Sequence, residues 1–277
     1  MDRLVSTEWL ASELGAADLV VLDAGMHLPD AGRDAKAEFL AGHIPGARFL
    51  DLESFVDTGS SVPKALPTAK LFAERLGALG IASDTRVVLY DDSQVKSSAR
   101  AWFVFAHFGF TEAAILDGGL AKWRAEGRAL ETGMPDVAPT TFPVPDPQRI
   151  VRSRDEMLAN CASCADQVVD ARDAARFAGA EGSGSEGHIP GAANLHFPRL
   201  FEADGTWKSP EAIRAEFATE GIDLARPVTT SCNSGVTACV LLFGLGLAGK
   251  DDAALYDGSW LEWGADPTMP KEQGSAR

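Results

Sequence analysis

The sequence is poor in basic residues and in long apolar runs, and each shortage argues against a class of protein. Its 277 residues hold 25 Lys and Arg against 40 Asp and Glu, a formal net charge of −15. Such a surface repels phosphates, so neither nucleic acid nor an anionic membrane is expected as a partner. No run reaches about eighteen apolar residues, and no charged start leads into an apolar signal core. We therefore expect a cytoplasmic protein.

Cysteine is also scarce, and four cysteines without a secretion signal do not suggest a disulfide framework. Cys161 and Cys164 form a Cys-x-x-Cys pair, a pattern shared by redox dithiols and by half of a zinc site. No second pair and no nearby histidines complete a zinc tetrad, and the pair precedes an expected strand at 167–170 instead of following one. We interpret it as two cysteines near a helix end, and we expect Cys239 to pack in the core.

What the sequence does contain is an internal repeat. Val20–Asp23 corresponds to Val168–Asp170, and His43 corresponds to His188. Each half alternates short β-branched runs with amphipathic segments, which predicts an α/β fold with a parallel sheet flanked by helices. A proline-rich stretch separates the halves, so we predict a first domain at 1–132, a linker at 133–149 and a second domain at 150–277.

The most informative segment surrounds Cys232. The apolar, β-branched run 227–230 predicts a short buried strand before it, and the apolar run 239–243 predicts a buried helix after it. A cysteine between a strand end and a helix N-terminus lies where unpaired backbone N–H groups converge. These donors stabilise a thiolate, the nucleophilic form of cysteine. Gly235 allows the loop to curl tightly, because glycine accepts a positive φ.

The two halves differ at this position. Asp91 stands in the first half where Cys232 stands in the second, so the first domain has no sulfur nucleophile there. Arg100, just after this loop, is a candidate for bridging the domains; an exposed position on a helix surface is the alternative.

Several motifs in a fixed order resemble the tandem-domain rhodanese family, and within it the 3-mercaptopyruvate sulfurtransferases more than the thiosulfate sulfurtransferases. They are the segments Cys232–Cys239, His43–Ala47, His188–Ala192, Asp117–Trp123, Lys208–Glu211 and Tyr256–Gly264. The resemblance implies two rhodanese-like domains, of which the second is catalytic. A phosphatase loop of the form Cys-x5-Arg is disfavoured, because the sixth residue after Cys232 is Ala238 and only Arg277 follows as an arginine.

The resemblance also implies a mechanism in which the Cys232 thiolate takes sulfur from a donor as a persulfide and passes it on. The donor is 3-mercaptopyruvate, or alternatively thiosulfate, and the acceptor is a thiol or cyanide, with a thioredoxin-like reductant among the candidates. No metal or organic cofactor is required. Ser234 is implied to help proton movement, and the loop cradle consists of Asn233, Gly235, Val236 and Thr237.

Arg176 aligns with a family arginine that binds the carboxylate of the donor, whereas a structural arginine is the alternative. The chain departs from the family at three places. Asn233 replaces a glycine, the segment 179–187 lacks a second arginine, and Lys64 stands where a first-domain histidine is usual, with Glu53 at the associated carboxylate position. These departures leave open a weakly catalytic persulfide carrier or docking module.

Overall fold

The computed structural model describes residues 1–275; Ala276 and Arg277, at the end of the predicted second domain, lie outside the described residues. The chain forms two compact units. Unit 1 comprises 1–57, 66–148 and 202–207, and unit 2 comprises 58–65, 149–201 and, among the described residues, 208–275. These units differ from the predicted boundaries in two short segments. Lys64, expected in the first domain, belongs to unit 2 because 58–65 packs there.

The sheet of unit 1 is parallel throughout, in the order β1-β5-β4-β2-β3. Its three central strands are apolar and almost entirely buried, as expected for a parallel sheet with both faces covered. The strands are β1 (Leu4–Val5), β2 (Leu19–Asp23), β3 (Arg48–Phe49), β4 (Arg86–Tyr90) and β5 (Ala113–Leu116).

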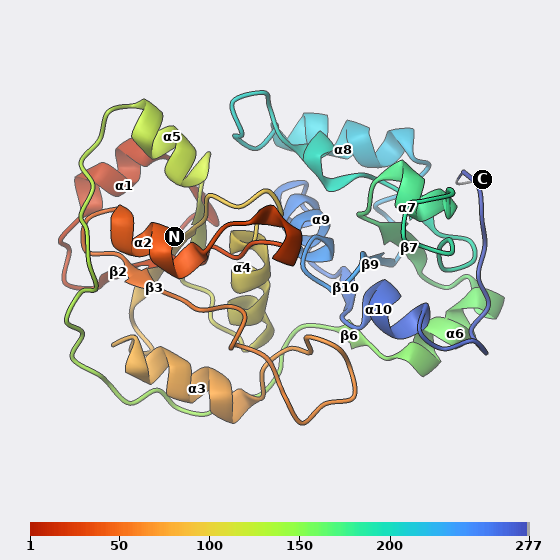
Figure 1. Ribbon diagram of the computed structural model, residues 1–277, viewed down its shortest axis with the longest axis horizontal. Coiled ribbons are helices and arrows are strands. Elements are labelled where there is room, and N and C mark those ends of the chain that lie inside the picture. Colours follow the sequence, from red (N-terminus) through yellow and green to blue (C-terminus); the bar gives the residue numbers. More distant parts are fainter. Residues whose placement is uncertain (276–277) are drawn as a thin grey trace. The chain divides into compact units, whose positions relative to one another are not determined.

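Helices cover both faces of this sheet (Figure 1). Residues of α1 (Thr7–Glu13), α2 (Ala35–Ala41) and α5 (Gly119–Ala125) share one buried cluster with β-strand side chains. The helix α4 (Ser98–His107) packs against β4 and β5, and Phe72 of α3 (Ala69–Ala78) contacts Phe105 of α4 edge to face, with ring centroids 5.5 Å apart. A 3-10 turn, η1 (Pro29–Ala31), precedes α2. The predicted linker is irregular and packs on unit 1, where Thr140 donates its N–H to Gly77.

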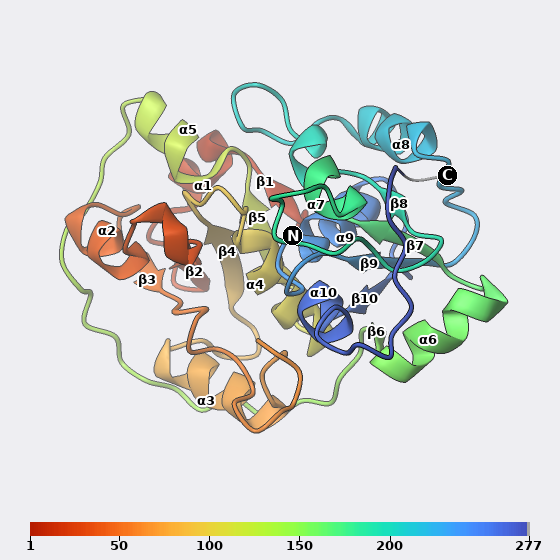
Figure 2. The ribbon, with the colours of Figure 1, turned by 45° about the vertical axis from the view of Figure 1, so that its right-hand side comes forward.

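Unit 2 repeats the arrangement, with a parallel sheet in the order β6-β10-β9-β7-β8 that can be followed in Figure 2. The prediction of a tandem α/β fold is confirmed. The strands are β6 (Val151–Arg152), β7 (Gln167–Asp170), β8 (Ala193–Asn194), β9 (Val228–Ser231) and β10 (Ala254–Tyr256). The helices are α6 (Arg154–Ser163), α7 (Ala174–Ala178), the 3-10 turn η2 (Phe197–Leu200), α8 (Pro210–Thr219), α9 (Ala238–Leu247) and α10 (Ser259–Trp263).

Polar residues begin most of these helices, because a side-chain oxygen can accept one of the unpaired N–H groups of the first turn. Ser6 caps α1, and Ser153 forms a reciprocal capping box with Glu156 at α6. Ser209 caps α8 with Pro210 as the first helical residue. Among residues 1–275, no helix has both the length and the apolar character needed to cross a bilayer.

The two His-Ile-Pro-Gly-Ala motifs have a structural role that is the same in both units. The imidazole Nδ1 of His43 lies 2.8 Å from the Phe39 carbonyl, and that of His188 lies 2.8 Å from the Phe177 carbonyl. Each histidine ring also stacks on the phenylalanine whose carbonyl it contacts, with ring centroids 4.0 Å apart for His43 and 3.7 Å apart for His188. Both histidines are buried. The motif therefore ties the chain before β3 or β8 to the preceding helix.

Candidate functional site

Cys232 lies at the carboxyl edge of the sheet of unit 2. The strand β9 ends at Ser231 and α9 begins at Ala238, so the predicted order of strand, cysteine loop and helix is confirmed. Gly235 has φ +76°, the left-handed conformation that its sequence position predicts. The Cys232 side chain is only 1% exposed. Its sulfur therefore stands close to a helix N-terminus, where the helix dipole favours negative charge.

A second loop, between β10 and α10, supports the Cys232 loop from the side. The Cys232 N–H donates to the Ser259 hydroxyl at 3.1 Å, and the Ser259 hydroxyl donates to the Tyr256 carbonyl at 2.8 Å. The Trp260 N–H donates to the Cys232 carbonyl at 3.0 Å. Sequence reasoning found the segment 256–264 as a motif but missed Ser259, whose φ of +49° is unusual for a residue other than glycine.

The loop of unit 1 that is equivalent to the Cys232 loop holds a buried carboxyl group. Asp91 is buried there, and its carboxylate accepts hydrogen bonds from the Ser93 N–H at 2.8 Å, the Ser93 hydroxyl at 2.9 Å and the Ser98 N–H at 2.8 Å. Ser98 is the first residue of α4. The loop is held as in unit 2, because the Leu120 N–H donates to the Asp91 carbonyl. A carboxyl group that accepts hydrogen bonds thus occupies the loop of unit 1, at the position that Cys232 has in unit 2.

Arg176 lies on α7, in the segment that follows the neighbouring strand β7. The Ala171 N–H donates to the Ser231 carbonyl at 2.8 Å, so this segment adjoins the loop of Cys232. The Arg176 side chain is 41% exposed, and its Nε donates to the Asp173 carboxylate at 2.5 Å. Burial opposes ionisation of Asp173, yet hydrogen bonds from the backbone and side chain of Arg176 lower the pKa of that carboxyl.

His196, which sequence reasoning missed, lies two residues after β8 at the same edge. Burial lowers the pKa of His196; the charge of Asp173 opposes this shift, and Arg176 and Arg199 add to it. The fold therefore favours the neutral form of the His196 imidazole. No motif marked it, since a single histidine carries no sequence signal.

Arg172, which lies between β7 and α7, is a poor candidate for binding a donor. It is 2% exposed, and its guanidinium donates to the Asp170 carboxylate, to the Ser185 hydroxyl and to the Gly187 carbonyl. It also lies 4.7 Å over the Trp260 ring. The guanidinium of Arg172 therefore stabilises the segment 179–187 and the loop of Trp260, and its N–H groups already have acceptors within the protein.

The remaining predicted residues are dispersed. Glu53 is exposed in unit 1 after β3, whereas Lys64 is exposed with φ +55° in a segment of unit 2, so no single unit holds both. Arg100 is 6% exposed on α4, which rules out the exposed helix-surface alternative. Asn233, Ser234 and Thr237 are partly exposed, and Val236 and Gly235 are buried.

The chain matches the rhodanese-like domain family twice, over residues 6–126 and 153–266. It belongs to the rhodanese family, in the form with two domains in tandem. It is 40% identical over 270 residues to human 3-mercaptopyruvate sulfurtransferase, covering 94% of this chain and 91% of the relative. It is 39% identical to chicken thiosulfate sulfurtransferase over 268 residues, covering 94% and 92%.

A solved structure of the same fold is that of the Escherichia coli 3-mercaptopyruvate sulfotransferase SseA. It superposes with a TM-score of 0.86 at 34% identity and covers 94% of this chain and 99% of that protein. The relatives are transferases of sulfur-containing groups, with 3-mercaptopyruvate and thiosulfate enzymes both among them.

Proposed function

We propose that this protein is a sulfurtransferase that moves sulfur from 3-mercaptopyruvate to a thiol or cyanide acceptor through a persulfide on Cys232. The observation that carries the proposal is the carboxylate of Asp91, which accepts three hydrogen bonds in the loop of unit 1 equivalent to that of Cys232. The two loops share the order of strand, loop and helix, and in each an N–H from the next loop donates to the carbonyl of Asp91 or Cys232. The N–H and hydroxyl of Ser234, which are equivalent to those of Ser93, would therefore stabilise a thiolate and an anionic persulfide.

In this mechanism the Cys232 thiolate attacks the sulfur of 3-mercaptopyruvate. The bond between that sulfur and the donor carbon breaks, the carbon keeps the electron pair as an enolate, and a proton then gives pyruvate. The acceptor thiolate next attacks the outer sulfur and leaves Cys232 as a thiolate. Ser234 is equivalent to Ser93, whose hydroxyl donates to Asp91, so the Ser234 hydroxyl is suited to move the proton near the reacting sulfur.

The partly exposed pair Asn233 and Ser234 carries no charge and should favour 3-mercaptopyruvate over thiosulfate, which is a dianion. We expect a higher kcat/KM for 3-mercaptopyruvate in parallel assays with cyanide as acceptor. Changing Asn233→Arg together with Ser234→Lys should move the preference towards thiosulfate by roughly tenfold or more, because each added charge–anion hydrogen bond is worth about 1.5–3 kcal/mol.

The double variant Asn233→Gln with Ser234→Thr, which keeps both positions neutral, is the matched control and should not change the donor order. A wild-type preference for thiosulfate would overturn the proposed donor and favour the second candidate, a thiosulfate sulfurtransferase. That candidate is supported by the 39% identity to the chicken enzyme. Undetectable turnover with both donors would instead support a persulfide carrier or docking module.

Arg176→Ala should raise KM for 3-mercaptopyruvate roughly tenfold, with little change in kcat. A charge-assisted bond to the donor carboxylate is worth at least about 1.5 kcal/mol, and we expect the lower end because the side chain is 41% exposed and already paired with Asp173. Initial rates over a range of donor concentrations separate KM from kcat.

Arg199→Ala is the matched control, since Arg199 follows β8 at the same edge but is paired with Glu216 and Glu220. It should leave KM unchanged, and an equal rise in both variants would assign the effect to general charge. Lys64→Ala measured in parallel tests whether Lys64 binds the donor in place of the missing second arginine or moves a proton in place of the histidine. A raised KM indicates donor binding, and a lowered kcat indicates proton movement.

We also propose that the protein works in the cytoplasm with a thioredoxin-like protein among its sulfur acceptors. All four cysteines are free thiols, which suits a reducing compartment. Fractionation of cells that express the full chain tests the location.

A further inference from the structure

The Cys161–Cys164 pair lies at the end of α6, on the opposite side of unit 2 from Cys232. Cys164 ends the helix in the left-handed conformation, with φ 50° and ψ 32°, and its N–H donates to the Asn160 carbonyl at 2.8 Å. Glycine or asparagine normally occupies this helix-ending position, because a larger side chain is strained there. Residues other than glycine that are held in such a strained backbone conformation cluster at functional sites.

The loop that presents Cys164 is fastened on both sides. The Asn160 amide donates to the Asp166 carbonyl at 3.0 Å, and its oxygen accepts from the Asp166 N–H at 2.9 Å. The Arg226 guanidinium donates to the Cys164 carbonyl at 3.3 Å. The position of the thiol is therefore set by the fold and not by a freely moving chain.

The two thiols differ in environment. Cys164 is exposed, whereas Cys161 is partly buried against the cluster that contains Met157 and Trp263. Burial raises the pKa of the Cys161 thiol, and the neighbouring Cys164 raises it further. Cys161 lies in the last turn of α6 and Cys164 follows that helix three residues further along the chain, close enough to affect the ionisation of Cys161. The proposed disulfide brings their Cβ atoms to about 3.5–4.5 Å. This combination suits an exposed attacking thiol and a protected resolving thiol.

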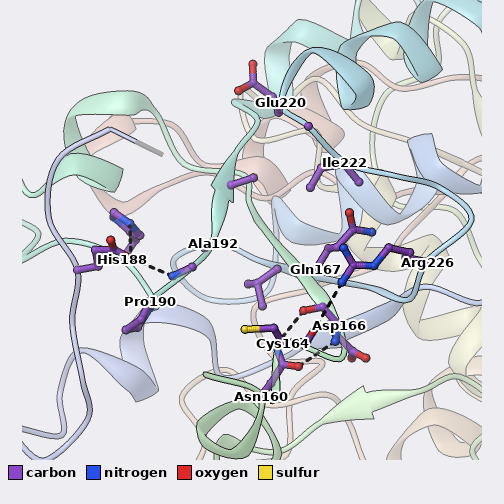
Figure 3. Close-up of a pocket in the computed structure, with 15 residues that line it drawn as sticks. Asn160, Cys164, Asp166, Gln167, His188, Pro190, Ala192, Glu220, Ile222 and Arg226 are labelled. Carbon is purple, nitrogen blue, oxygen red and sulfur yellow. Dashed lines mark hydrogen bonds and ion pairs between the residues drawn. The ribbon is translucent and has the colours of Figure 1, made fainter. Parts of the chain in front are cut away.

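Cys164 lines a pocket of about 440 Å³, and Figure 3 shows its sulfur directed into the space towards Pro190. The pocket lies at the amino edge of the sheet, where β7 begins at Gln167 and β8 begins at Ala193. Cys232 follows the carboxyl end of β9, so the pocket belongs to a different edge. Its charged lining combines the cation Arg226 with the carboxylates of Asp166, Glu220 and Glu272.

We propose that Cys164 and Cys161 form a second thiol site, which exchanges with a small amino-acid disulfide bound in this pocket. The Cys164 thiolate attacks one sulfur of the disulfide, forms a mixed disulfide and releases one thiolate. Cys161 then loses its proton and attacks the Cys164 sulfur, which forms the Cys161–Cys164 disulfide and releases the second thiolate. In the sum, two protein thiols are oxidised and the small disulfide is reduced to two thiols.

The lining selects the class of ligand. Arg226 offers its guanidinium to a carboxylate. The carboxylates of Asp166 and Glu220 are paired with Arg152 and Arg199, whereas that of Glu272 lies 3.9 Å from the His188 imidazole and offers an acceptor to an ammonium group. A zwitterionic disulfide such as cystine satisfies both conditions within the available volume. Glutathione disulfide is larger and more acidic, and 2-hydroxyethyl disulfide has neither charge.

The test uses the full chain with Cys232→Ser, so that the candidate nucleophile does not react. Intact-protein mass spectrometry during exposure to cystine should show loss of the mass of two hydrogens, and peptide mapping should place the disulfide between Cys161 and Cys164. Adding Cys161→Ala should stop the reaction at a half-cystine adduct on Cys164. Cystine should react faster than either of the other two disulfides, and Arg226→Ala should remove this advantage.

Cys164→Gly is the matched control, because glycine adopts the same backbone conformation. It should react with no disulfide at this pair, keep a melting temperature no lower than wild type, and transfer sulfur through Cys232 at the wild-type rate. Folded protein that forms no Cys161–Cys164 disulfide with any of the three reagents would overturn the site. Equal rates for all three would overturn the amino-acid class of ligand.

Discussion

Cys232→Ser should abolish sulfur transfer from either donor, with a fall in kcat of more than roughly a thousandfold, the scale expected when a covalent nucleophile is removed. A serine hydroxyl is not ionised near neutral pH and cannot hold a transferable sulfur. The substitution is nearly isosteric in a position that is 1% exposed, and the backbone bonds to Ser259 and Trp260 do not involve the sulfur. The circular dichroism spectrum and the melting temperature should therefore stay close to wild type.

Mass spectrometry after treatment with donor alone gives the direct readout. The wild type should gain one sulfur, and the peptide that contains Cys232 should carry it. Cys164→Ser is the matched control, since that thiol is more exposed yet lies at the other edge of the sheet; this variant should gain the sulfur normally. A persulfide mapped to Cys161 or Cys164 would overturn the assignment of the nucleophile.

Asp23→Asn should stabilise the protein at pH 8, whereas Asp170→Asn should destabilise it, although the two residues are equivalent in the repeat. Asp23 is 6% exposed. Burial raises its pKa from 3.8 to about 7; hydrogen bonds from the Gly25 N–H and the Tyr90 hydroxyl oppose the shift, and Asp91 and Asp92 add to it. Asp170 is also buried, but its carboxylate is bound by the guanidinium of Arg172.

The pH dependence of the Asp23 effect has a definite sign. A carboxyl with a raised folded pKa binds more protons in the folded state than in the unfolded state, so stability falls as pH rises from about 4 to about 7. The whole loss corresponds to roughly 4 kcal/mol and is complete above pH 7. Asparagine still accepts from the Gly25 N–H and has no charge to desolvate. The advantage of Asp23→Asn should therefore grow from pH 5 to pH 7 and then level off.

Asp170→Asn has the opposite consequence, because it leaves the Arg172 guanidinium buried without its counter-ion. Loss of one partner of a buried ion pair costs about 3–5 kcal/mol. Urea unfolding of wild type and both variants at several pH values between 5 and 8 measures the free energies. Parallel pH profiles for wild type and Asp23→Asn would show that Asp23 is ionised in the folded protein and would contradict the raised pKa.

The fold and the position of the nucleophile could be predicted because their signals are local. The β-branched runs at 20–23 and 168–170 mark buried parallel strands, and the apolar run after Cys232 marks a buried helix. A cysteine placed between a strand and a helix is therefore at a helix N-terminus in any fold that keeps this order. The internal repeat predicted two domains in tandem, because two halves with similar sequences are expected to fold in the same way.

Only the tertiary structure shows the electrostatic environment of the buried carboxyl groups and the hydrogen bonds that hold the Cys232 loop in place. Asp23 and Asp170 have the same neighbours in the strand pattern, yet burial raises the pKa of Asp23 whereas the Asp170 carboxylate is bound by Arg172. Ser259 supports Cys232 from 27 residues away, and the exposure of Arg176 depends on Asp173 and on the packing of α7. Burial, desolvation and hydrogen bonds between distant segments depend on which loops meet at a sheet edge, and no local pattern of residues contains that information.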